Sequence, residues 1–312
     1  FHFHPFIMKL KFIIPLFFSL TIFAQQTTKV DFKIADAVLQ LNFEQQSISG
    51  EMNYSFAVLS KIDTIRIDAK NMHFSNVKIN NKTVDFVNSG KELKLFKGFK
   101  KGKNTLTFEY SAKPKQTLYF VGEGGGKQIW TQGQGKYTSH WLPSFDDENE
   151  KVIFNTTVSF ATDFEVFSNG ILANKSSKND LTVWEYQMPH PMSSYLMMLE
   201  IGKFEKQTQT SNSGTPLEFY ISPEDLWKIE PTYRYSKQIF DFFETEIGVA
   251  YPWKVYRQIP VKDFLYAGME NTTSTLFAQD FVVDSIGFND RNYVNVNAHE
   301  LAHQWFGDLI TA

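Results

Sequence analysis

The amino-acid sequence predicts an α+β protein of more than one domain, in which an antiparallel β-rich N-terminal part precedes a mixed α/β part. Two observations support this prediction. From about residue 28 to 205, apolar and polar side chains alternate with a period of two, which is typical of strands with one exposed face. After residue 223, apolar side chains recur at helical spacing instead. The chain has 312 residues, 42% of them hydrophobic, which is enough for about two domains.

The N-terminal β domain is expected to cover residues 25–205. The alternation is clearest in VDFKIADAVLQLNF (30–43), TIRIDAK (64–70) and TLTFEYSAK (105–113). Residues typical of turns, INNKTV (79–84) and KKGKN (100–104), separate such runs. Short turns between alternating runs favour antiparallel pairing, so we expect a sheet with one face exposed to water.

The sequence changes character near residue 206. Residues 205–216, EKQTQTSNSGTP, are polar and rich in turn formers, which indicates an interdomain linker. A strand is expected at 217–221, a helix between Pro223 and Gly248, a strand at 255–261, and a last helix from near Asp290. The apolar positions expected to bury the first helix are Leu226, Ile229, Tyr233, Ile239, Phe242 and Phe243.

The N-terminus has the features of an export signal. Residues 1–7 precede Met8 and resemble no part of such a signal, so we interpret them as an upstream translation artefact. Residues 8–24 combine a short basic segment, a run of 12 mostly apolar residues and the small Ala24. Twelve residues rise about 18 Å as a helix, too little for a stable membrane span. We expect an exported protein, periplasmic or secreted.

Composition excludes several classes of function. Lys and Arg number 31 against 34 Asp and Glu, so a net charge of -3 offers no basic field for nucleic acid. Cysteine is absent, which removes disulfides, thiolate metal ligands and cysteine nucleophiles. A metal site in this chain must therefore use histidine and carboxylate side chains.

The segment HELAHQWFGD, residues 299–308, has the pattern of a zinc helix. On a helix, positions i and i+4 face the same side, so His299 and His303 can bind one ion. Glu300 lies beside that face and can act as a general base toward water on the metal. Metal-assisted hydrolysis is the chemistry that this pattern indicates, while two structural histidines on a solvated helix are the plain alternative.

Around this motif the sequence resembles the M1 family of zinc aminopeptidases. AHELAHQWFGDLIT (298–311) is similar to the zinc helix of that family, and AGMEN (267–271) is similar to its exopeptidase signature. TQGQ (131–134), followed by Pro143, and IGKFE (201–205) resemble segments of its N-terminal domain. The resemblance implies that residues 206–312 are the first part of a thermolysin-like zinc peptidase domain.

The resemblance also implies a role for each matching residue. His299 and His303 would bind one Zn²⁺ ion, and Glu300 would activate the water. The substrate-binding residues would be Glu270, Gln134, Gly268, Met269 and Asn271, with Glu270 and Gln134 holding the free amine of a peptide. The third zinc ligand, a Glu, would lie beyond residue 312, so the chain would be an N-terminal fragment that is inactive alone.

Two other functions stay open at this stage. A thermolysin-like endopeptidase would share the His-Glu-x-x-His pattern, and a peptide-binding relative without catalysis would share the fold. One departure bears on the exopeptidase signature, because Ala267 occupies a position where the family usually has Gly. The partners expected are peptides with a free N-terminus.

Overall fold

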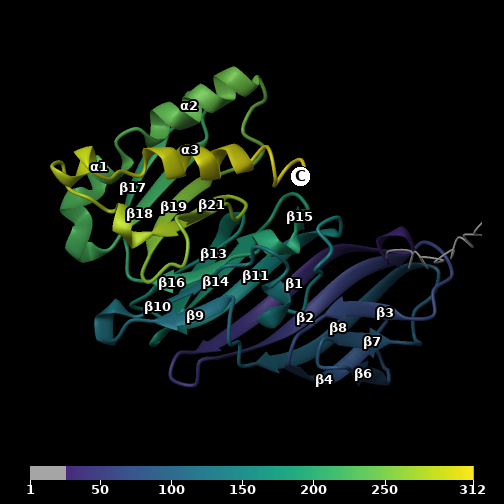
Figure 1. Cartoon of the computed structure of the whole chain (residues 1–312). Helices are drawn as coiled ribbons and strands as arrows, with labels where there is room; N and C mark the ends of the chain where they lie inside the picture. The colour runs from purple at the N-terminus through teal and green to yellow at the C-terminus, as the bar shows by residue number, and fades with distance from the viewer. Residues whose placement is uncertain (1–25, 312) are drawn as a thin grey trace, which may run out of the picture.

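The computed structural model describes residues 26–311, so the expectations for residues 1–7 and 8–24 lie outside the described residues. The structure confirms the predicted α+β class. Figure 1 shows the N-terminal strands as one β-rich part and the later strands and helices as a second part beside it. Within residues 26–311, no helix is both long and apolar enough to cross a membrane.

The N-terminal part contains three sheets. The largest has nine strands in the order β13-β14-β11-β1-β2-β8-β4-β5, with β15 also paired to β11, and the smaller ones run β12-β16-β10-β9 and β3-β7-β6. The strand bounds are β1 Val30–Asn42, β2 Ser47–Val58, β3 Ile65–Asp68, β4 Met72–Ile79, β5 Lys82–Thr83, β6 Phe86–Asn88, β7 Glu92–Leu95, β8 Gly102–Ala112, β9 Leu118–Val121, β10 Gln128–Thr131, β11 Lys151–Ala161, β12 Glu165–Ser168, β13 Ile171–Lys178, β14 Leu181–Gln187, β15 Met192–Ser193 and β16 Leu199–Gly202.

One ladder departs from the antiparallel pairing that the alternation favours. Strand β1 pairs with β2 in antiparallel fashion, but with β11 in parallel, with Ile34 opposite Ile153. The reason is connectivity, because β11 returns to β1 only after β2 to β10, so no tight turn fixes its direction. The alternation itself is confirmed, since every second residue along most of β1 is buried.

The second part of the molecule contains a five-stranded sheet, which carries the candidate site. Its order is β17-β18-β19-β21-β20, and β18, β19 and β21 are parallel to one another. The bounds are β17 Glu205–Thr210, β18 Pro216–Ile221, β19 Tyr256–Val261, β20 Gly268–Met269 and β21 Ser274–Ala278. The predicted linker at 205–216 is therefore wrong. Those residues form β17 and the hairpin to β18, and their polar composition reflects an edge strand whose side chains are nearly all exposed.

The helices pack against this sheet (Figure 1). They are α1 Ile229–Tyr233, α2 Ser236–Ile247 and α3 Val294–His303, with a 3-10 turn at Pro223–Lys228 before α1. The single helix expected from 223 to 248 is thus broken, although Gly248 does end α2 in a left-handed conformation. Because of the break, Leu226 and Phe242 point into solvent instead of the core.

The last helix begins later than the sequence suggests. A 3-10 turn at Gly287–Asn289 and a bend precede it, and the Asn292 side chain accepts a hydrogen bond from the backbone N–H of Val294. Helix α3 therefore starts at Val294 and not near Asp290. The shift does not affect the two histidines, which lie in its last two turns.

A small apolar cluster joins the two parts of the molecule. Trp130 and Phe167 of the N-terminal part share it with Ile259 and Leu276 of the five-stranded sheet. Glu200 lies opposite both aromatic residues in the strand register, so its side chain projects from the same face of the sheet. Its carboxylate is fully buried and has no hydrogen-bond partner among residues 26–311.

We expect Glu200→Gln to raise the thermal stability at pH 7 but not at pH 4. Burial raises the pKa of Glu200 well above its usual value, so folding requires a proton that the unfolded chain releases above about pH 4.3. The free energy of unfolding should therefore fall as the pH rises from about 4.3 toward the raised pKa, by about 1–3 kcal/mol for a buried unpaired group. The corresponding gain in Tm is roughly 2–10 °C. Calorimetry at both pH values, with exposed Glu246→Gln as control, tests this, and equal gains at both would contradict it.

Candidate active site

Helix α3 presents two histidines to one point. The Nε2 atoms of His299 and His303 are 3.3 Å apart, and the ring planes lie at 82° to each other. The Nδ1 atom of His303 is 3.1 Å from the carbonyl oxygen of Phe306. If Nδ1 donates its proton to that carbonyl, the Nε2 atom keeps a free lone pair that can bind a metal.

The spacing of the two Nε2 atoms fits a tetrahedral zinc ion. Two ligands at about 2.0–2.1 Å from zinc, separated by a tetrahedral angle, lie about 3.3–3.4 Å apart. A hydrogen bond between the two rings would give a similar distance, so the spacing alone is compatible with both. Within the described residues, no group of three or more His, Asp or Glu side chains could hold a metal. Residues 26–311 therefore supply two imidazole side chains, those of His299 and His303, as metal ligands.

Glu300 is buried against the loop that carries the predicted exopeptidase signature. Only 5% of its surface is exposed. Burial, and then the nearby charge of Glu270, raise the pKa of Glu300 to about 8. A Cβ atom at Gly268 would lie 2.3 Å from the Oε1 atom of Glu300. An alanine at position 268 would therefore force the side chain of Glu300 to move.

Glu270 follows the edge strand β20 and is held in place by helix α3. The side-chain amide of Gln304 donates hydrogen bonds to the carbonyl oxygens of Glu270, at 3.1 Å, and Asn271, at 3.3 Å. Its own oxygen accepts hydrogen bonds from the backbone N–H of Thr273, at 2.9 Å, and from the hydroxyl of Tyr251. Since Gln304 directly follows His303, the same helix that carries the histidines fixes the position of Glu270.

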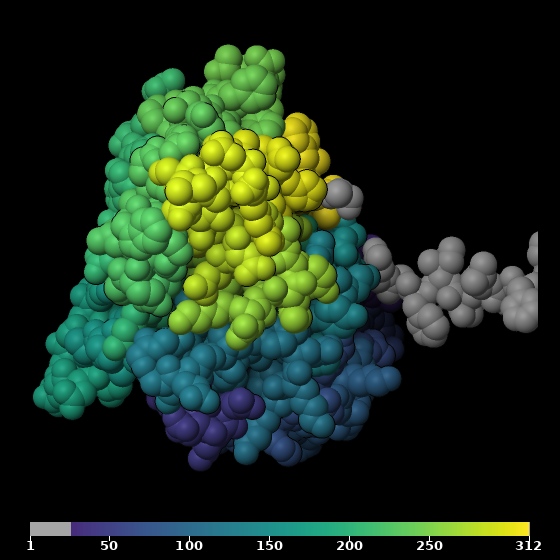
Figure 2. Space-filling view, turned by 60° about the vertical axis from the view of Figure 1, so that its left-hand side comes forward, coloured from purple at the N-terminus to yellow at the C-terminus, as the bar shows by residue number. Residues whose placement is uncertain are grey.

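The two histidines, Glu300 and Glu270 line one hollow of about 350 Å³ between the two parts of the molecule. Its lining residues are Gln134, Tyr266, Ala267, Gly268, Glu270, Asn295, Val296, His299, Glu300 and His303. Gln134 comes from the N-terminal part, as the sequence predicted, and the others come from the second part. Figure 2 shows the yellow and yellow-green surface of the second part meeting the teal surface of the N-terminal strands.

Two predicted substrate-binding residues do not line this hollow. Met269 is fully buried, and its sulfur accepts a hydrogen bond from Gln132 of the N-terminal part at 3.7 Å. The side-chain amide of Asn271 is also fully buried and has no hydrogen-bond partner within residues 26–311. At these two positions, the structure supports a role in shaping the loop.

Sequence reasoning missed the residues that hold the signature loop in place. Gln304, the C-cap of α3, lies four positions after Glu300, so helical periodicity could have indicated that both face the sheet. Thr273 and Asn169 gave no such signal. Asn169 contacts Thr272 across 103 positions of sequence, and only the folded chain shows that contact.

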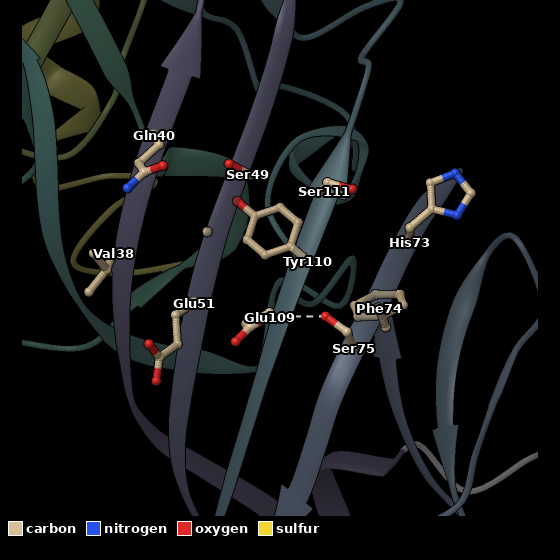
Figure 3. A pocket seen from close by; sticks show the side chains of 11 residues that line it. Val38, Gln40, Ser49, Glu51, His73, Phe74, Ser75, Glu109, Tyr110 and Ser111 are labelled. Atoms are coloured by element: carbon tan, nitrogen blue, oxygen red, sulfur yellow. Dashed lines mark hydrogen bonds between the residues drawn. The ribbon is translucent and has the colours of Figure 1, made fainter.

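A larger hollow lies elsewhere, on the exposed face of the nine-stranded sheet. It has a volume of about 510 Å³ and is bordered by β1, β2, β4 and β8. Figure 3 shows its lining, in which Ser75 donates a hydrogen bond to Glu109 at 3.1 Å. Glu51 and Glu109 lie directly opposite each other in the register. This hollow brings together neither an imidazole pair nor a buried base, so the catalytic candidates are confined to the smaller one.

Two family models match this chain, one in each part of the molecule. The family model of the peptidase M1 N-terminal domain matches residues 33–196, and that of the peptidase family M1 domain matches residues 232–312. The chain therefore belongs to peptidase family M1, as its sequence motifs predicted.

Named relatives of the chain are aminopeptidases. Glutamyl aminopeptidase of Bos taurus is 31% identical over 180 residues, which are 54% of this chain and 18% of that protein. Leucyl aminopeptidase of Saccharolobus solfataricus is 26% identical over 256 residues, 80% of this chain and 32% of that protein. A probable aminopeptidase 1 of Sulfurisphaera tokodaii is 25% identical over 288 residues, 87% of this chain and 36% of that protein. The chain thus spans about a fifth to a third of their lengths.

Proposed function

We propose that the protein is a zinc-dependent aminopeptidase that removes N-terminal residues from peptides. The observation that carries the proposal is the shared hollow, in which the carboxylate of Glu270 and the pair His299 and His303 line the same space. The names of the relatives agree with it. In an exopeptidase, a carboxylate beside the metal-binding histidines can pair with the ammonium group of the substrate.

Zinc is the metal that the donor set favours. Imidazole nitrogens suit zinc, and the distance between the two Nε2 atoms matches a tetrahedral site. A bound zinc ion would polarise the scissile carbonyl and lower the pKa of water to about 7. We propose that a further protein ligand lies outside residues 26–311, since a catalytic zinc site needs about three.

The chain's own residues would then divide the work. Glu300, with its raised pKa, can take a proton from the attacking water and deliver it to the leaving amine. Glu270 and Gln134 would bind the substrate ammonium from two sides and so fix how far the peptide enters. Strand β20 is at the edge of its sheet, so the free backbone groups of Gly268 and Met269 can pair with an extended substrate.

The endopeptidase alternative uses the same metal chemistry but gives Glu270 no task. An internal peptide bond has no charged amine beside it, and burying a carboxylate at 6% exposure without a partner is costly. The position of Glu270 in the hollow therefore favours the exopeptidase.

The metal content of variants tests the zinc site. Protein expressed from the complete gene should bind one zinc ion per chain, and His303→Ala should lose it, because a single remaining imidazole of this pair binds weakly. His73→Ala, on the exposed face of strand β4, is the matched control and should keep its zinc. Zinc measured by elemental analysis after dialysis decides the matter. An unchanged zinc content in His303→Ala would mean that the two histidines form a structural pair.

We expect Gly268→Ala to lower kcat by about ten- to a hundredfold. The added methyl group would lie 2.3 Å from Glu300 Oε1 and must push the base away, and a shift of 1 Å can cost about a hundredfold. Gly125→Ala is the control, because an added Cβ atom there meets nothing within 4 Å and the backbone has no positive φ. Steady-state kinetics at full zinc loading gives the comparison. Equal kcat values for Gly268→Ala and wild type would show that the contact with Glu300 is unimportant.

A further inference from the structure

A strained turn follows directly on Glu270. The carbonyl oxygen of Asn271 accepts a hydrogen bond from the N–H of Ser274 at 2.8 Å, and Thr273 has a φ of 72°. A positive φ at the third position of such a turn is usually occupied by glycine, and it is unfavourable for a β-branched residue. Within residues 26–311, only Thr117 and Thr273 are β-branched residues with positive φ.

Every polar group of Thr273 is bound, although its surface is almost completely buried. Its N–H donates to the side-chain oxygen of Gln304 at 2.9 Å, and its carbonyl accepts from the N–H of Arg257 at 2.9 Å. Its hydroxyl accepts from the N–H of Gly170 at 2.8 Å. A strained conformation persists when the surrounding structure holds it at several points, and such residues concentrate at functional sites.

The three partners belong to different elements. Gln304 directly follows helix α3 as its C-cap, Arg257 lies in β19, and Gly170 belongs to the turn between β12 and β13 of the N-terminal part. In that turn, the side chain of Asn169 donates to the carbonyl of Thr272 at 2.8 Å and accepts from the N–H of Met198 at 2.7 Å. Thr273 thus contacts the N-terminal part, the five-stranded sheet and the C-cap of helix α3.

We propose that Thr273 is a positioning residue that sets the reach of Glu270 toward the substrate amine. The assignment rests on the aminopeptidase function proposed above. The amide of Gln304 binds Thr273 with its oxygen and the Glu270 carbonyl with its nitrogen. A movement of Thr273 therefore displaces Glu270 relative to His303, the residue before Gln304. The hydroxyl bond to Gly170 extends this control to the N-terminal part, which also supplies Gln134.

The hydroxyl and the backbone make opposite demands on residue 273. Glycine would adopt the positive φ more easily but would lose the bond to Gly170. Serine would keep a hydroxyl, whereas valine would keep the branched shape and, like glycine, leave the N–H of Gly170 without this acceptor. If backbone strain in the turn were the only effect of residue 273, Thr273→Gly would leave amine recognition unchanged. A positioning role predicts instead that Thr273→Gly weakens amine recognition.

The test uses zinc-loaded protein from the complete gene and two anilide substrates, one with a free α-amine and one that lacks the amine. For wild type, kcat/KM should be far higher with the amine. Thr273→Val and Thr273→Gly should lower this preference about three- to tenfold, as expected for one hydrogen bond, mainly through KM, while Thr273→Ser stays near wild type. Kinetics measured well below the melting temperature of each variant separate this effect from instability.

Two outcomes would overturn different statements. If wild type prefers the amine and Thr273→Gly and Thr273→Val keep that preference in full, the positioning role is wrong and the aminopeptidase assignment stands. If wild type cleaves both anilides equally well, the aminopeptidase assignment fails and the role of Thr273 fails with it. Hydrogen exchange of residues 270–274, faster in the Gly and Val variants but not in Ser, should accompany the kinetic change, and unchanged exchange in all three would also contradict the proposal.

Discussion

Glu300→Gln should lower kcat by about two to four orders of magnitude while the protein keeps its zinc. Transfer of a proton by a positioned base contributes about 10²–10⁴-fold, and glutamine has the shape of glutamate without its basicity. Burial and the charge of Glu270 raise the pKa of Glu300, so its carboxylate is a stronger base than that of an exposed glutamate. The side chain is therefore suited to accept a proton from water and to release it again.

Kinetics and zinc content must be measured on the same preparations of Glu300→Gln. The exposed Glu246→Gln on α2 serves as the matched control and should behave like wild type. A Glu300→Gln protein that has lost its zinc would make Glu300 a ligand and not a base. Full activity with full zinc would exclude Glu300 from proton transfer altogether.

Glu270→Ala should reduce kcat/KM on unblocked peptides by about ten- to a few hundredfold. A charge-assisted hydrogen bond in a buried site is worth about 1.5–3 kcal/mol, or about ten- to 150-fold, and the loss of burial can add to it. Glu270 is buried at the wall of the hollow, so no water replaces it easily as a partner of the ammonium group. Gln134→Ala should have a smaller effect, because Gln134 is exposed and uncharged.

The blocked substrate provides the control for Glu270→Ala. On an N-acetylated peptide the amine charge is already absent, so wild type and Glu270→Ala should be similarly poor enzymes. A variant that loses activity equally on both kinds of peptide would show that Glu270 supports the structure of the site and not the recognition of the amine.

The local part of this architecture could be predicted from sequence. Alternation along β1 and helical spacing around α3 depend on short-range geometry, so the strand and the facing histidines followed from the residues alone. The polar strand β17 was mistaken for a linker, because an exposed edge strand and a loop have similar composition. The break between α1 and α2 was missed for a related reason, since apolar spacing continues across it.

The candidate site was predictable only in its motifs. The sequence singled out His299, Glu300, His303 and Glu270, and the structure brings all four to one hollow together with Gln134. The hydrogen bonds that hold Glu270 there depend on contacts between distant segments, such as that of Gly170 with Thr273. No periodicity in the sequence encodes such a contact, so the supporting residues became visible only in the folded chain.

The products from one pair of peptides test the central claim most directly. Protein from the complete gene, loaded with zinc, is incubated with an unblocked peptide and with its N-acetylated counterpart, and the products are followed by mass spectrometry. If Glu270 binds the ammonium group beside the two histidines, the unblocked peptide should lose residues one at a time from its N-terminus, and the acetylated peptide should stay intact. Efficient internal cleavage of the acetylated peptide would contradict the aminopeptidase assignment and identify an endopeptidase that uses the same His299, Glu300 and His303.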